Sequence, residues 1–148
     1  MNINKKVFGK IYSNRRLARE RALQILYSWE ISNYDIKDIE VNFVIDQNMN
    51  NVNIFYFQKL YIGVTNHTQE LDELMSPYLS RKINQLGCIE RIILRIALFE
   101  LSECLDVPYK VIINEAIELA KIFGAEKSHK FVNGVLDKVA LQIRTNSK

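Results

Sequence analysis

The stretch INQLGCIERIILRIALFELSECL, residues 83–105, carries apolar side chains in every direction around a helix. A surface helix of a soluble protein presents a single apolar stripe, whereas a helix that is apolar all round is packed on several sides. The sequence therefore predicts a central helix here, surrounded by other helices. Only 5 glycines and 2 prolines interrupt the 148 residues, which favours helices joined by short connections.

Apolar side chains at three- and four-residue steps predict further helices on both sides of the central one. They fall in residues 13–30, 31–47, 53–80, 106–124 and 125–143. We expect the third segment to break near Thr65–Thr68, and Asp106 with Pro108 to begin the fourth segment, which Gly124 ends. No alternating strand pattern is present, so the predicted fold class is all-α.

The predicted buried faces follow from the same spacing. In the first helix they comprise Ala18, Ala22, Ile25, Leu26 and Trp29; in the second, Ile36, Ile39, Phe43 and Val44; in the third segment, Ile54, Phe57, Leu60, Tyr61, Val64, Leu71, Leu74 and Met75; and in the last helix, Val132, Val135, Leu136, Val139 and Ile143. These faces together are large enough to form one hydrophobic core.

The two ends of the chain are expected to be less ordered. Residues 1–12 lack helical periodicity and are predicted to form a flexible basic arm, followed by a single all-helical domain at 13–148. Ser13 or Asn14 would cap the first helix of that domain. Residues 144–148 are expected to fray.

Charge is distributed unevenly along the chain. Residues 1–21 hold seven basic side chains and one acidic one, whereas residues 28–80 hold eight acidic and two basic ones. This asymmetry predicts one anionic and one basic partner, the alternative being patterning for solubility. Four arginines also fall at the predicted start of the first helix, where the helix dipole disfavours cations and favours an incoming phosphate.

Motifs for catalysis and metal binding are absent from the sequence. His67 and His129 have no second ligand at metal spacing, and there is no glycine-rich phosphate loop or nucleophile elbow. Cys88 and Cys104, about 24 Å apart on one helix, are too distant for a disulfide. No apolar run reaches the roughly 18 residues that span a bilayer, and no signal-peptide pattern precedes the domain. We therefore expect a cytoplasmic binding protein without catalysis, metal or membrane.

Three blocks in this order resemble the NusB family of bacterial transcription antitermination factors: RRLARERALQILYSW, ERIILRIALFEL and PYKVIINEAIELAKIFGAEKSHKFVNGVLDKVA. The resemblance covers residues 14–143 and implies about seven helices, arranged as two three-helix units plus one extra helix. It implies binding to single-stranded RNA, the boxA element of the ribosomal RNA leader, together with NusE, a small-subunit ribosomal protein. Other Nus factors and RNA polymerase would join indirectly, with no cofactor.

The resemblance also implies which residues meet these partners. The arginine-rich start of the family maps onto Arg15, Arg16 and Arg19, which would contact RNA. The aromatic residue of the LYSW motif is Tyr27, near both RNA and protein partner, and Glu90 matches a position near the protein partner and RNA. The GAE-x-SHKFVNG block contributes further RNA-binding residues: Lys127, Ser128, Lys130, Phe131 and Asn133.

Structural interpretations of these residues stay open at this stage. Tyr27 and Phe131 could pack at the rim of the core, Lys127 and Lys130 could mark a solvated helix end, and Glu90 could pair with Arg91 or Arg95. The small residue in Asn133-Gly134 would let another helix approach or leave room for a ligand. Relatives can carry an acidic residue at the position of Lys127. The lysine in this chain favours contact with phosphate there.

The chain as a whole also has alternative interpretations. It could be a helical interaction module for a basic protein, with RNA binding incidental, as the acidic segment 28–80 suggests. A domain attached to a ribosomal RNA methyltransferase and a DNA-binding helix-turn-helix are less favoured. The RNA sequence recognised, and whether the free chain is a monomer or a homodimer, are not encoded in any recognisable pattern.

Overall fold

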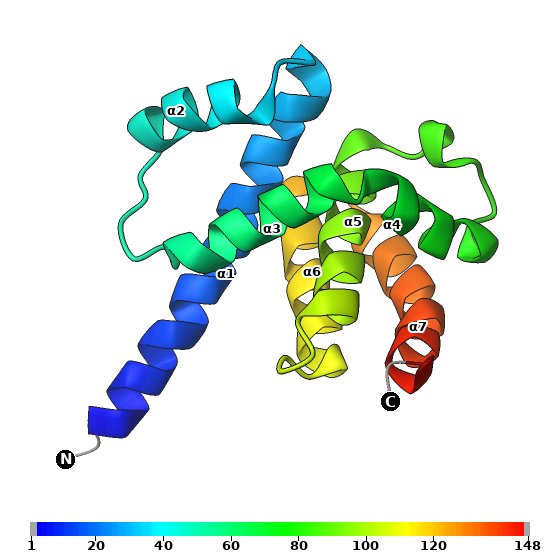
Figure 1. Cartoon of the computed structure of the whole chain (residues 1–148). Coiled ribbons are helices and arrows are strands. Elements are labelled where there is room, and N and C mark those ends of the chain that lie inside the picture. The colour runs from blue at the N-terminus through cyan, green and yellow to red at the C-terminus, as the bar shows by residue number, and fades with distance from the viewer. Residues whose placement is uncertain (1–2, 147–148) are drawn as a thin grey trace. The chain divides into compact units, whose positions relative to one another are not determined.

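The computed structural model describes the backbone of residues 3–146 and the side chains of residues 14–145. Within this range the chain forms seven α-helices, two 3-10 helices and no strand (Figure 1). The all-α prediction is confirmed. The α-helices are α1 (Ile3–Ser32), α2 (Ile36–Asp46), α3 (Ile54–Asn66), α4 (Thr68–Met75), α5 (Cys88–Glu103), α6 (Tyr109–Phe123) and α7 (Ser128–Asn146); the 3-10 helices are η1 (Ser76–Tyr78) and η2 (Ile83–Gln85).

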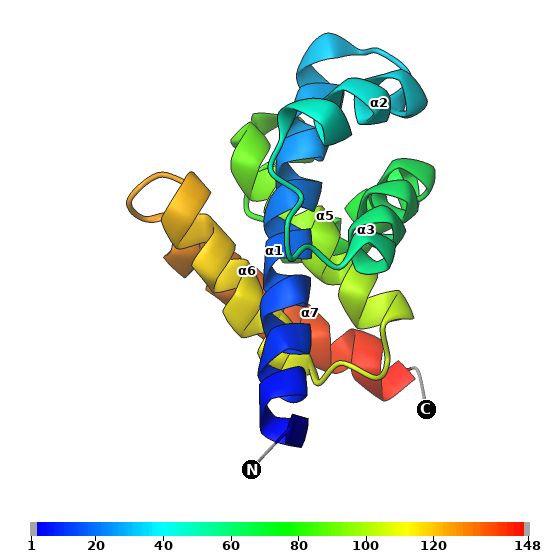
Figure 2. The same ribbon diagram turned by 90° about the vertical axis from the view of Figure 1, so that its left-hand side faces the viewer.

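The chain divides into two compact units, residues 1–62 and residues 63–148. The first unit contains α1, α2 and most of α3, and α2 packs against the C-terminal part of α1 (Figure 2). Its core includes the stacked rings of Phe43 and Phe57, whose centroids are 5.9 Å apart. Four of the five core residues predicted for the first helix are fully buried: Ala18, Ala22, Ile25 and Leu26.

Some predicted core positions of the first unit are exposed instead. Trp29 is half-buried, while Val44 and Ile54 are exposed. Val44 lies on a short helix that buries only Phe43 along its length, and Ile54 is the first residue of α3. Side chains on short helices or terminal helix turns have few neighbouring helices to pack against. The prediction that Val44 and Ile54 are buried is therefore wrong.

The first helix begins much earlier than its predicted cap. α1 starts at Ile3, so neither Ser13 nor Asn14 is a cap, and Arg15 to Arg21 lie in the middle of the helix. The segment before Ser13 contains no proline, and a single glycine costs a helix only about 1 kcal/mol. The side chains of residues 1–13 lie outside the described residues, and the basic arm and single domain stay predictions.

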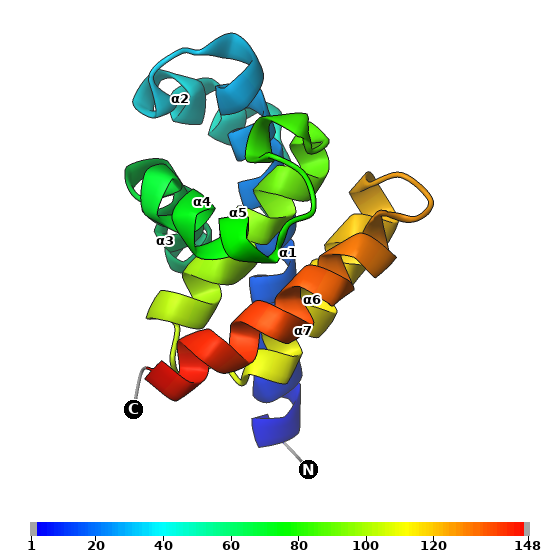
Figure 3. The same ribbon diagram turned by 90° about the vertical axis from the view of Figure 1, so that its right-hand side faces the viewer.

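The second unit is built around α5, as predicted. α5, α6 and α7 pack against one another, and α4 contacts α5 and α7 (Figure 3). Every side chain from Ile92 to Leu101 is buried, including the charged Arg95 and Glu100. Arg95 donates two hydrogen bonds to Asp72 of α4, at 2.8 and 2.9 Å. This bidentate pair offsets the cost of removing the guanidinium from water.

The helix boundaries of the second unit agree with the sequence in most places. α3 and α4 are separated at His67, Pro77 lies in η1, and Gly124 is the C-cap of α6. The N-cap of α6 is Pro108 rather than Asp106. Of the predicted core residues here, Leu74 is exposed and Ile143 is partly exposed.

The C-terminal end of α7 is tied to the rest of the second unit instead of fraying at residue 144. Arg144 donates hydrogen bonds to the backbone carbonyls of Leu101, Cys104 and Val107, at 2.9, 3.3 and 2.8 Å. These carbonyls lie at and beyond the end of α5, where helix geometry leaves them without intrahelical partners. One guanidinium thus satisfies three acceptors, an arrangement that periodicity alone does not reveal.

Neither cysteine forms a disulfide; Cys88 is partly exposed and Cys104 is buried. Among the described helices, none combines the length and apolar character that crossing a membrane requires.

Candidate nucleic-acid interface

The arginines of α1 do not form one exposed cluster. Arg15 and Arg19 both lie over the ring of Tyr56 from α3, with guanidinium carbons 4.7 and 5.4 Å from the ring centroid. Tyr56 is buried and Arg19 is only 4% exposed. Arg21 donates to the carbonyl of Asn48 at 3.0 Å and is likewise engaged within the first unit.

The burial of Arg19 corrects the expectation that all these guanidinium groups are open to solvent. A side chain that is 4% exposed offers no surface to a polyanion. The cation–π contact with Tyr56 helps to stabilise the charged group there. Arg16 is exposed, while Arg15 and Arg21 are half-buried, so Arg16 presents the most accessible of these four cations.

Tyr27 shares a side of α1 with Arg16. At about 100° per residue the two positions point in nearly the same direction, and they are about 16 Å apart along the helix. Tyr27 is 40% exposed, so its ring is accessible from solvent. The first unit therefore presents a cation and an aromatic ring on one side of a single helix.

The predicted residues of the second unit gather on the first turns of α7. Lys127 and Lys130 are exposed, whereas Ser128 is buried. Ser128 packs against Gly124, because a Cβ placed on that glycine would lie 2.8 Å from the Ser128 Cβ. Ser128 therefore shapes the junction of α6 and α7, and the two lysines supply its surface charge.

Phe131 is partly exposed, and Arg81 lies over its ring. The Arg81 guanidinium carbon is 5.7 Å from the centroid of Phe131. Arg81 is itself exposed, so the pair combines a charge and a ring at the surface. The sequence analysis did not predict a role for Arg81. The only indication of one is that Arg81 and Lys82 are two consecutive basic residues after η1.

Asn133 lines a groove of about 420 Å³ along α6 and α7. Its other lining residues are Tyr109, Lys110, Ile113, Asn114, Asp137 and Leu141. The neighbouring Gly134 is exposed, and a Cβ there would meet no atom within 4 Å. The interpretation that this glycine permits close helix packing is therefore wrong, and open surface lies beside Asn133.

Glu90, predicted near the protein partner, is half-buried in the first turn of α5. Its carboxylate makes no ion pair with another described residue. Arg95 is paired with Asp72, and Arg91 donates to the carbonyl of Leu86 at 3.2 Å. The alternative that Glu90 pairs internally with Arg91 or Arg95 is not observed.

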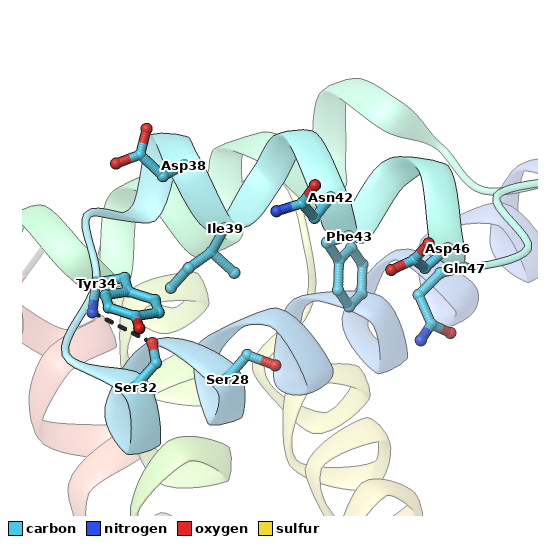
Figure 4. A pocket seen from close by; sticks show the side chains of 9 residues that line it. All are labelled: Ser28, Ser32, Tyr34, Asp38, Ile39, Asn42, Phe43, Asp46 and Gln47. Atoms are coloured by element: carbon cyan, nitrogen blue, oxygen red, sulfur yellow. Dashed lines mark hydrogen bonds between the residues drawn. The ribbon is translucent and has the colours of Figure 1, made fainter.

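A cleft of about 610 Å³ lies where the end of α1 meets α2 in the first unit (Figure 4). Ile39 and Phe43 point from α2 towards α1 and form its apolar floor, while polar residues of both helices border it. Two of these, Asp38 and Asp46, are carboxylates at its rim that pair with no cation among the described residues. The cleft suits a positively charged group that brings an apolar stem.

Phe55 is the other residue that sequence reasoning missed. It is 85% exposed in the first turn of α3. The sequence does indicate this exposure, because position 55 lies opposite the apolar face of that helix. Among the described residues there is no group of three histidine, cysteine or acidic side chains that could hold a metal ion.

Comparisons with known proteins agree with the resemblance in the sequence. The NusB family profile matches residues 16–141. Transcription antitermination protein NusB of Sodalis glossinidius (strain morsitans) is 64% identical over 134 residues, which are 90% of this chain and 96% of that protein. The family is known by its role in antitermination, in agreement with the prediction of a protein that is not an enzyme.

Solved structures lead to the same family. T. maritima NusB matches with a TM-score of 0.78 and 31% identity, covering 90% of this chain and 94% of that chain. NusB from a crystal structure of the antitermination factors NusB and NusE in complex with dsRNA matches with a TM-score of 0.76 and 28% identity, covering 88% and 98%. The chain belongs to the NusB family.

Proposed function

We propose that this chain is a transcription antitermination factor that binds the boxA element of nascent ribosomal RNA together with NusE. A relative that is 64% identical carries the name of this activity, and a structural relative was crystallised with NusE and RNA. The complex would act in the cytoplasm, where it reaches other Nus factors and RNA polymerase. The chain's contribution is binding, and it catalyses no step.

The observation that carries the RNA-binding role is that each unit combines exposed cations with an aromatic ring that is exposed or partly exposed. Arg16 and Tyr27 share one side of α1, and Lys127 and Lys130 accompany Phe131 at the start of α7. Guanidinium and ammonium groups contact phosphates, while aromatic rings stack on unpaired bases. Buried Arg19 would instead hold Tyr56 in place and support the surface from beneath.

A titration of labelled single-stranded boxA RNA, with and without NusE and across a salt series, tests this function. If four phosphates are neutralised, log K should fall with log salt at a slope of about −3. Arg16→Ala should weaken binding and reduce the magnitude of the slope by about 0.7. Lys138→Ala removes an exposed charge outside the proposed surface and serves as the control. Absence of RNA binding, both alone and with NusE, would contradict the proposal.

The acidic cleft at α1 and α2 favours a second role, docking of a basic protein segment. Its rim carboxylates Asp38 and Asp46 are free to pair with lysine or arginine, and Ile39 and Phe43 can cover the apolar stem of such a side chain. Titration with purified NusE in the absence of RNA tests this role. The double variant D38N/D46N should weaken binding, whereas E126Q should not; unchanged binding in the double variant would exclude the cleft.

A further inference from the structure

Phe55 is exposed to a degree that folding does not explain. Of the large apolar side chains exposed in the described chain, it has the highest exposed fraction, 85%. The buried residues of the first turns of α3 are Tyr56, Phe57 and Leu60, and Phe55 lies on the opposite side of the helix. A phenylalanine in water gains none of the stabilisation that burial of its ring would give. The ring is therefore available for an intermolecular contact.

A cationic side chain lies beside Phe55 on the exposed face of α3. Lys59 lies one turn further along the same face of α3, at the i+4 position where side chains are neighbours. Lys59 is exposed and makes no ion pair with another described residue. The nearby carboxylate of Glu40 is bonded to Gln58 of α3, whose amide nitrogen is 3.3 Å away. The exposed face of α3 thus combines an aromatic ring with an unpaired positive charge.

The start of α3 is also fixed against the arginine stretch of α1. The backbone N–H of Asn53 donates to the carbonyl of Asn14 at 3.1 Å, beside Arg15. Tyr56, the residue after Phe55, carries the guanidinium group of Arg15 over its ring. The turn of α3 that carries Phe55 is therefore fixed in the first unit against the stretch of α1 that contains Arg15.

We propose that Phe55 is a base-stacking platform that extends the RNA-binding surface from α1 onto α3, with Lys59 contacting the adjacent phosphate. This inference rests on the proposed function. The unpaired charge of Lys59 beside the ring favours a polyanion over a basic protein as the occupant. Stacking needs only the face of a ring and no hydrogen-bond pattern, so an isolated exposed phenylalanine is sufficient.

Titrations of labelled single-stranded boxA RNA with position 55 variants, in the presence of NusE, test the platform. Phe55→Ala should weaken binding by about 5- to 150-fold, which is the range that loss of one stacked base produces. Phe55→Leu keeps an apolar side chain but no ring, and should lose a similar amount. Phe55→Tyr should stay within about 3-fold of the wild type because it retains the ring.

Ile45→Ala is the matched control, since Ile45 is an apolar side chain that is 75% exposed on α2. It should leave RNA affinity unchanged, and Lys59→Gln should reduce the salt slope by about 0.7. If Phe55→Ala binds RNA like the wild type while Arg16→Ala binds weakly, the platform is excluded and the proposed function stands. If the wild type binds no RNA, the proposed function fails as well. If Phe55→Ala weakens only NusE binding, Phe55 belongs to a protein interface and the platform is again excluded.

Discussion

The contact between α3 and α5 in the second unit gives the sharpest stability prediction. Gly63 of α3 faces the ring of Phe99, which is buried on α5. A Cβ at position 63 would lie 2.2, 2.3 and 2.8 Å from three atoms of that ring. Ordinary contacts between carbon atoms are about 3.5–4.0 Å, so Gly63→Ala requires the ring to move by more than 1 Å.

The expected cost of Gly63→Ala is set by two opposing effects. Alanine gains about 1 kcal/mol over glycine in a helix interior, while forced overpacking of a core costs about 1–3 kcal/mol. Phe99 also stacks on His67, with ring centroids 6.4 Å apart, and this neighbour limits its freedom to move. We expect a net loss of about 1–2 kcal/mol in the free energy of unfolding, from the two effects combined with overpacking at its upper range.

Urea unfolding of Gly63→Ala, Phe99→Leu and the double variant measures this cost. Phe99→Leu alone should destabilise the chain because it removes buried ring atoms. In the double variant the smaller leucine makes room for the new methyl group, so the combined loss should be smaller than the sum of the single losses. Additive losses, or a Gly63→Ala variant as stable as the wild type, would refute the argument from close contact.

Three further predictions concern single side chains. Arg144→Ala leaves the carbonyls of Leu101, Cys104 and Val107 without their guanidinium donor and should lower the free energy of unfolding by about 2–4 kcal/mol; a loss below about 0.5 kcal/mol in urea unfolding would contradict this. Gly134→Ala adds a methyl group in open space within α7 and should raise the free energy of unfolding by about 0.5–1 kcal/mol; a lower melting temperature would contradict it, and weaker RNA binding by the stabilised variant would show that the space is used by the ligand. Burial, and then the neighbouring Glu40 carboxylate, raise the pKa of Tyr61, so the unfolded chain loses this proton first and stability should fall as the pH rises above about 10. Tyr61→Phe should flatten that part of the profile, and an unchanged slope would assign the alkaline loss to other groups.

The strongest features of the fold were predictable because they depend on dense, periodic apolar residues. The stretch 92–101 is buried all round, as its sequence indicates, and Pro77 and Gly124 mark real boundaries. The start of α1 was missed because three lysines and a glycine before Ser13 outweighed the apolar residues there, although Ile3, Val7 and Ile11 recur at four-residue steps. A helix can continue through such a segment because no residue in it forbids helical backbone, even though none requires it.

The full or partial burial of two arginines in the candidate site could be predicted from the helical pattern. Position 15 falls within the apolar arc of Ala18, Ala22 and Leu26, and position 19 falls at its edge. Their contacts with Tyr56 were not recoverable, because they depend on where α3 meets α1. Arg81 over Phe131 is hidden for the same reason, since fifty residues separate the partners in the sequence.

The division of labour among the α1 arginines changes how RNA binding should be dissected. The helix dipole acts only near the ends of a helix, and the arginines lie in the middle of α1, so the dipole neither disfavours them nor attracts phosphate to them. Removing Arg15 and Arg19 together would strip both cations from the buried ring of Tyr56 and disturb the start of α3, where Phe55 stands. A loss of RNA affinity in such a variant could then arise from structure alone. Arg16, exposed and on the side of Tyr27, reports on contact with the polyanion more directly than any variant that combines the three.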